Sequence, residues 1–174
     1  MPAISLVRAA FEPESRGSGI SRTAVSLFQS ITPRYVAWAR ERVTSGRAAK
    51  LSVTNISGTE WPLFGCVFYL RSVVALQDAW DKDPTLMRER PADFAREAIE
   101  ATTQLVIDPN HAQWVQEWWG KDYLTRENVF YRMLIIEALT AHARLTGEQT
   151  LLPMLRSQVN GMAAELEQSP WGLL

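Results

Sequence analysis

The residues best suited to chemistry lie between positions 122 and 132, where acidic, amide, phenolic and guanidinium side chains follow closely on one another. Residues four apart are neighbours on a helix, so Glu127 and Tyr131 can present an acid and a phenol to one ligand. We therefore predict Tyr131 and Glu127 as catalytic residues and Asn128 as a substrate-binding residue. The alternative is that Glu127 and Asn128 only cap the helix, because its first turn favours such side chains.

Four more reactive side chains have apolar or turn surroundings. Glu137 and His142 lie within an apolar segment, where a polar group needs a partner, and we interpret His142 as a structural or surface histidine. His111 follows a turn, and we expect it to face solvent. The apolar neighbours of Cys66 are expected to raise the pKa of its thiol and to place it in the core.

A pair of carboxylates on opposite walls of a cleft would support glycoside hydrolysis. The spacing of the acidic residues does not select one pair among the candidates: Glu60, Glu117, Asp122 and Glu127. The chain has one cysteine and no metal-binding or nucleotide-binding motif. We therefore predict no metal and no cofactor.

The composition is that of a globular domain, with 174 residues of which 47% are hydrophobic and 21% charged. A net charge of -1 does not favour nucleic acid as a partner. The longest apolar run, residues 61–70, is too short to span a bilayer. No secretory signal is recognisable, so we expect a cytoplasmic protein. Seven tryptophans point to a thick core or to an aromatic pocket.

Apolar periodicity and capping signals predict an all-α fold without strands. Residues 1–20 are expected to form a flexible arm, and residues 21–174 a helical-hairpin domain. Segment 63–80 is apolar on almost every face, which predicts a helix buried on most sides. The helices are expected at residues 21–30, 33–43, 63–80, 92–107, 109–119, 126–145 and 151–167.

Short connections at residues 81–90 and 146–150 predict antiparallel hairpins. The tripeptide Val-Phe-Tyr at residues 67–69 recurs at residues 129–131, early in a second apolar helix. This echo indicates helix-pair repeats, which need neighbours to bury their faces. Because the last residues, 171–174, are mostly apolar, we expect the front part of a longer α/α toroid.

The stretch Arg126-Glu127-Asn128-Val129-Phe130-Tyr131, followed by Leu145-Thr146-Gly147 and by Ser169-Pro170-Trp171-Gly172, resembles the linalool dehydratase/isomerase family. The resemblance covers about residues 60–174. It implies an (α/α)6 toroid, a homo-oligomeric ring and cofactor-free hydration, dehydration or isomerisation of a small isoprenoid alcohol or alkene. It also implies a hydrophobic pocket, for which Trp118 and Tyr69 are further substrate-binding candidates. The position of the family's catalytic histidine holds Leu134.

Two alternatives remain open on the sequence. A carbohydrate-active α/α toroid would use tryptophans to stack on sugar rings and a carboxylate pair for hydrolysis. A non-catalytic helical scaffold is favoured by Leu134 at the histidine position, and its assembly surface would be rich in Trp114, Trp118 and Trp119.

Overall fold

The computed structural model describes residues 19–126 and 128–169, and within these ranges every regular element is helical. The all-α prediction is therefore confirmed. The predicted arm, apart from residues 19 and 20, and the apolar end at 171–174 lie outside the described residues. The α-helices are α2 (Arg22–Ser45), α3 (Glu60–Lys82), α4 (Pro91–Phe94), α5 (Arg96–Ile107), α6 (Gln113–Trp119), α7 (Val129–Thr146) and α8 (Leu152–Gln168). Two short 3-10 helices are η2 (Arg47–Lys50) and η3 (Pro84–Leu86).

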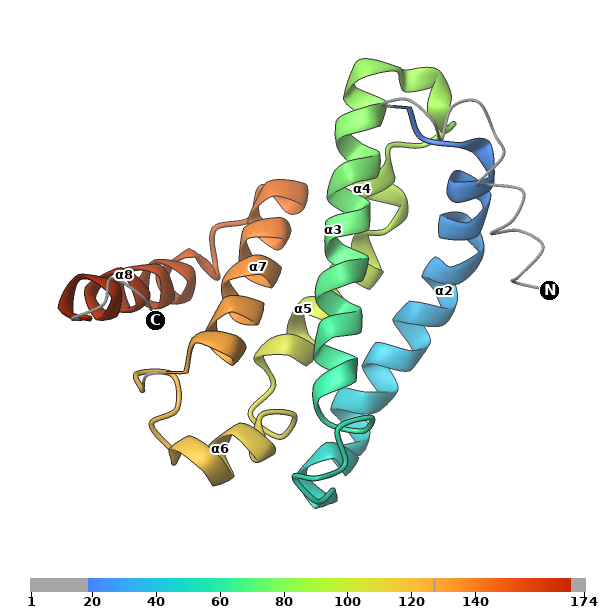
Figure 1. Ribbon diagram of the computed structural model, residues 1–174. Helices are drawn as coiled ribbons and strands as arrows, with labels where there is room; N and C mark the ends of the chain where they lie inside the picture. The colour runs from blue at the N-terminus through green and yellow to red at the C-terminus, as the bar shows by residue number, and fades with distance from the viewer. Residues whose placement is uncertain (1–18, 127, 170–174) are drawn as a thin grey trace.

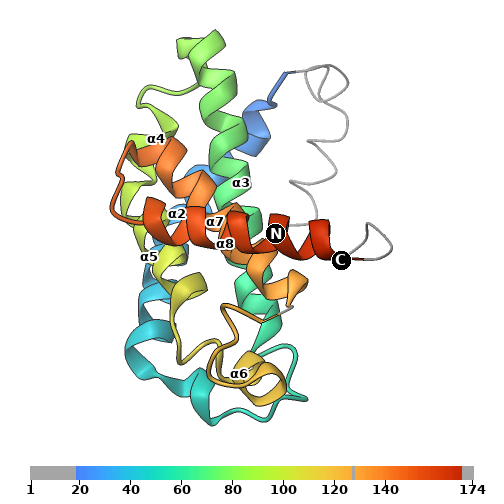
Figure 2. The ribbon, with the colours of Figure 1, turned by 90° about the vertical axis from the view of Figure 1, so that its left-hand side faces the viewer.

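α2, α3, α5 and α7 alternate in direction along the chain, whereas α8 lies across α7 (Figures 1 and 2). α3 runs antiparallel to α2 and α5, whereas α7 runs in the same direction as α3. α2 contacts α5, α3 contacts α7, and α8 packs on α7 on the side far from α2 (Figures 1 and 2). Helices of one direction thus lie beside each other, as in an array of helix pairs. None of the described helices combines the length and the apolar character needed to cross a bilayer.

α2 is one continuous helix of 24 residues, so the predicted interruption at Thr32 and Pro33 is wrong. Ser21 caps its start by accepting a hydrogen bond from the Ala24 N–H at 3.1 Å. Proline inside a helix removes one backbone bond, yet Thr32 keeps a local bond by donating its hydroxyl to the Phe28 carbonyl at 2.8 Å. Packing of the buried face against α5 outweighs the loss.

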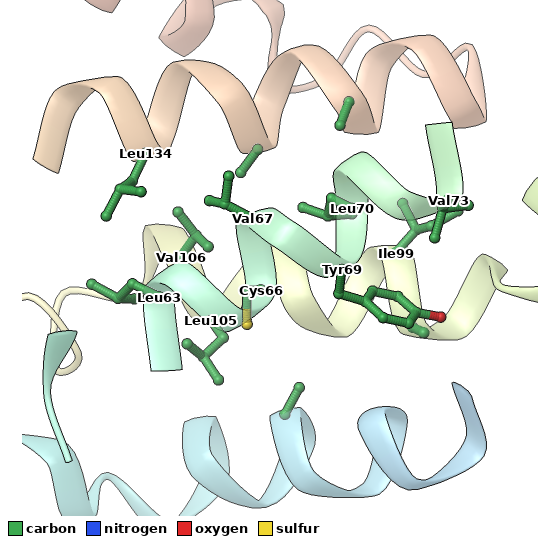
Figure 3. Close-up of a cluster of buried hydrophobic side chains, with 14 of the residues drawn as sticks. Leu63, Cys66, Val67, Tyr69, Leu70, Val73, Ile99, Leu105, Val106 and Leu134 are labelled. Carbon is green, nitrogen blue, oxygen red and sulfur yellow. The ribbon is translucent and has the colours of Figure 1, made fainter. Parts of the chain in front are cut away.

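The core is centred on α3, which contacts α4, α5 and α7. Figure 3 shows its inward side chains between the neighbouring helices, with Leu134 of α7 pointing toward it. Burial is complete for Leu63, Cys66, Leu70 and Val73. The expectation that α3 is buried on most sides is nevertheless only partly met: its inner face is covered, whereas the Trp61 and Phe68 side chains are largely exposed.

The helix boundaries after residue 90 differ from the predicted ones by more than one residue in three places. α6 begins at Gln113 rather than at residue 109. The expected helix at 92–107 is divided at Ala95 into α4 and α5. α7 begins at Val129 rather than Arg126, because Asn128 supplies the cap by accepting from the Tyr131 N–H at 3.3 Å. The end predicted at residue 145 is confirmed within one residue, since α7 ends at Thr146. Gly147 follows with a φ of 73°, a left-handed conformation that suits glycine.

The two Val-Phe-Tyr tripeptides, in α3 and α7, have the same pattern of burial. Phe68 and Phe130 are exposed, whereas Tyr69 and Tyr131 are buried. The Tyr69 hydroxyl donates to Thr32 of α2 at 2.9 Å, and the Tyr131 hydroxyl donates to the Val106 carbonyl of α5 at 2.9 Å. Each tyrosine therefore ties its helix to the long helix that runs antiparallel to it, which is consistent with two related helix pairs, α2/α3 and α5/α7.

Candidate functional site

α3 and α7 share a partly to largely exposed surface of large apolar side chains. We call it the aromatic face, formed by Trp61, Phe64, Phe68, Phe130 and Met133. Steps of three and four residues place these side chains on one side of each helix. The Phe64 ring links the two helices, with its centroid 5.0 Å from that of Phe130 in an edge-on arrangement. An exposed apolar patch of this kind is typical of a binding surface.

The same side of α3 and α7 becomes charged one turn beyond the aromatic face. Arg71 Nη1 lies 3.8 Å from a Glu137 carboxylate oxygen, and Arg144 forms an ion pair with Asp78. Between these pairs is a shallow groove of about 380 Å³. Glu137 follows Phe130 and Met133 by helical spacing, so an acid borders the aromatic face.

Tyr131, predicted as catalytic, is completely buried. Its hydroxyl donates to the Val106 carbonyl, and burial raises the pKa of the phenol well above its usual value. The ring also meets the Trp114 ring edge-on, with centroids 6.2 Å apart. Its hydroxyl therefore serves the contact between α5 and α7. Glu127, the other predicted catalytic residue, lies outside the described residues.

The three predicted substrate-binding residues are distributed over separate surroundings. Tyr69 is buried against α2, and burial raises the pKa of its phenol to about 12. Asn128 is buried at the start of α7, where it acts as the cap. Trp118 is 69% exposed on α6. Neither these three nor Tyr131 lines any of the four pockets described for this part of the chain.

The remaining candidates are placed as follows. His142 is buried rather than at the surface, and burial lowers the pKa of its imidazole. The expectation that His111 faces solvent is wrong, since only 1% of it is exposed. Cys66 is buried, and this burial raises the pKa of its thiol, as predicted. Arg132, four residues after Asn128, is buried under α8 and donates to Gln158.

The acids considered for glycoside hydrolysis are not gathered in a described pocket. Asp122 accepts a hydrogen bond from Arg126 at 2.7 Å, and neither it nor Glu60 nor Glu117 lines one of the four pockets. Within residues 19–126 and 128–169, no three His, Cys, Asp or Glu side chains come together as metal ligands would.

The aromatic face was not predicted as a surface from the sequence. The recurrence of Val-Phe-Tyr indicated helix-pair repeats, whereas the apolar pattern of α3 predicted burial on most sides of that helix. Comparison with known proteins gives no match to a family model, and finds no similar curated protein or solved structure.

Proposed function

We propose that the aromatic face is one wall of a site for a small apolar molecule, in a linalool dehydratase/isomerase-like protein that acts on an isoprenoid alcohol or alkene. The observation that carries the proposal is the exposed set of rings shared by α3 and α7, joined through Phe64 and Phe130. Burial of apolar ligand surface against such rings supplies the binding free energy. The resemblance of residues 126–147 to that family supplies the substrate class.

The chemistry proposed is loss of water from an allylic alcohol. An acid protonates the hydroxyl, the C–O bond breaks, water leaves, and a base removes a proton from the allylic cation to give the alkene. The π faces of aromatic rings attract such a cation. Glu137, with a carboxylate oxygen 3.8 Å from Arg71 Nη1, borders the aromatic face and is suited to the base step. Glu127 remains the predicted acid, and Tyr131 acts through packing, because its hydroxyl is already bonded to Val106.

Binding can be tested separately from turnover by titrating the protein with linalool and following tryptophan fluorescence. We expect Phe68→Ser to weaken binding roughly tenfold, which corresponds to about 1.4 kcal/mol of lost apolar burial. The matched control is Leu166→Ser on α8, a residue that is 43% exposed and lies away from the aromatic face. If the two variants bind linalool with equal affinity, the aromatic face is not part of the binding site.

Turnover is tested by gas chromatography of the products formed from linalool. We expect Glu137→Gln to abolish alkene formation and to leave linalool binding within about twofold of the unaltered chain. Binding without any turnover by the unaltered chain would favour the second candidate function, a non-catalytic binding scaffold. Leu134 at the family's histidine position and the internal bond of Tyr131 favour that candidate.

A homo-oligomeric ring belongs to the same proposal, since the resemblance implies it. Light scattering coupled to size-exclusion chromatography measures the mass directly. A monomer at the concentrations used for the turnover assay would contradict this part of the proposal and leave the binding test unaffected.

A further inference from the structure

A second concave site lies at the C-terminal end of α2, far along that helix from its cap at Ser21. We call it the α2-end pocket: a cavity of about 260 Å³ between the last turn of α2, η2, the loop at residues 51–58 and His111. Its lining is mainly polar. The volume is just below the range typical of pockets for drug-sized ligands, so it suits a small molecule.

Arg42 is held in a fixed position in this pocket. One Nη atom donates to the Gly58 carbonyl at 2.6 Å, and the guanidinium lies over the Trp38 ring at 5.4 Å. The loop that offers this carbonyl is itself fixed, because Asn55 accepts from the Gly58 N–H at 3.0 Å. The Arg42 Nε is buried and has no hydrogen-bond partner within the described residues. A rigid guanidinium fork with donors to spare is well matched to an oxyanion.

His111 contributes a second unpartnered group to the same lining. Its side chain is 1% exposed, and neither ring nitrogen has a hydrogen-bond partner among the described residues. Buried polar atoms are normally bonded, and those that are not call for an explanation such as a bound ligand. Burial and then the charge of Arg42 lower the pKa of His111 to about 4, so its neutral ring offers one N–H donor.

The charges around the α2-end pocket favour an anion. Arg42 and Arg47 line it together with one acid, Glu41. The C-terminal end of α2 adds about half a negative charge. The net charge of the lining is therefore slightly positive. Its two cations are Arg42, whose Nε has no partner among the described residues, and Arg47, which is exposed.

We propose that the α2-end pocket binds a small oxyanion, with Arg42 and Arg47 as charged donors and the His111 ring as a hydrogen-bonding wall. The proposal is independent of the aromatic face and of the function proposed for it. Phosphate and carboxylate groups share the chemistry that this lining recognises. Chloride has the charge but lacks the two oxygens that a guanidinium fork can bond.

The test uses the whole chain and its two histidines, which give separate imidazole signals in ¹H–¹⁵N NMR spectra. Titration with inorganic phosphate, and separately with malonate, is expected to move the His111 signals saturably and to leave those of His142 in place. The tighter of the two anions identifies the natural group as phosphoryl or carboxylate. Unmoved His111 signals, or equal shifts with chloride at the same ionic strength, would overturn the proposal.

A pair of exposed cations in η2 provides matched variants. Arg47 lines the α2-end pocket and Lys50 does not, although both are exposed in the same short helix. Arg47→Gln is expected to weaken phosphate binding at least about threefold, and Lys50→Gln to leave it nearly unchanged. Equal weakening by both variants would mean that only general positive charge acts, which would refute a specific site.

Discussion

The guanidinium of Arg132 lies so close to Gly161 that a Cβ on this glycine would be 2.2 Å from Nη2. The arginine is buried and held in place by Gln158, whose side chain and carbonyl it meets at 3.0 and 3.2 Å, and by an ion pair with Glu165. Its charge is thereby satisfied beneath α8. The absence of a side chain at Gly161 is what lets α8 approach α7 at this point.

We expect Gly161→Ala to lower the free energy of unfolding by about 1–3 kcal/mol, because the buried Arg132 network has to shift. Helix propensity alone would raise it by about 1 kcal/mol, so the expected sign is opposite to that of an ordinary helix position. Urea denaturation measures the difference. Asn160→Ala, at the exposed neighbouring position, is the control and should be neutral or slightly stabilising. A stability gain in Gly161→Ala would contradict the close packing.

Tyr131→Phe is expected to destabilise the fold by about 1–3 kcal/mol, because the Val106 carbonyl near the end of α5 loses the donor that satisfies it. Tyr69→Phe should cost less, about 1 kcal/mol, since Thr32 still donates to Phe28. Thermal or urea unfolding ranks the two variants. Linalool binding should be retained in both. The reverse ranking would show that the Tyr131 hydroxyl contributes less to stability than that of Tyr69.

Acid should destabilise the protein through His111. Its pKa is 6.5 when unperturbed and about 4 in the fold, where burial disfavours the charged ring. The unfolded chain therefore takes up a proton that the folded chain excludes, and the stability supplied by the neutral ring is lost as pH falls from about 6.5 to 4. NMR titration of the imidazole measures the folded pKa directly. A pKa near 6.5 in the native protein would contradict the burial of His111.

Cys66 is expected to resist thiol reagents in the native state at mildly alkaline pH. Its side chain is fully buried in the core, and burial raises the pKa of the thiol, so the reactive thiolate is scarce. Ellman's reagent should detect one thiol per chain in urea and almost none before unfolding, because this is the only cysteine. Rapid reaction of the native protein would mean that the inner face of α3 opens readily.

The sequence by itself determined the helical class and the C-terminal ends of most helices. Capping and termination depend on a few neighbouring residues, and such local rules placed two helix ends, predicted at residues 43 and 145, within two residues of those in the structure, where Gly46 and Gly147 follow. The Val-Phe-Tyr echo likewise marked two helices that turned out to be equivalent in their contacts. The apolar setting of Cys66 was sufficient to predict its burial and the direction of its pKa shift.

Only the tertiary structure decided which polar groups are buried and which apolar ones are exposed. Pro33 stays inside α2 because packing against α5 outweighs one lost backbone bond. His111 is enclosed by segments distant in sequence. Phe68 is exposed because no described helix covers that side of α3 and α7. Burial depends on contacts with residues far along the chain, and the spacing of apolar residues does not predict those contacts. The two candidate sites proposed for this protein therefore became visible only once the helices were placed side by side.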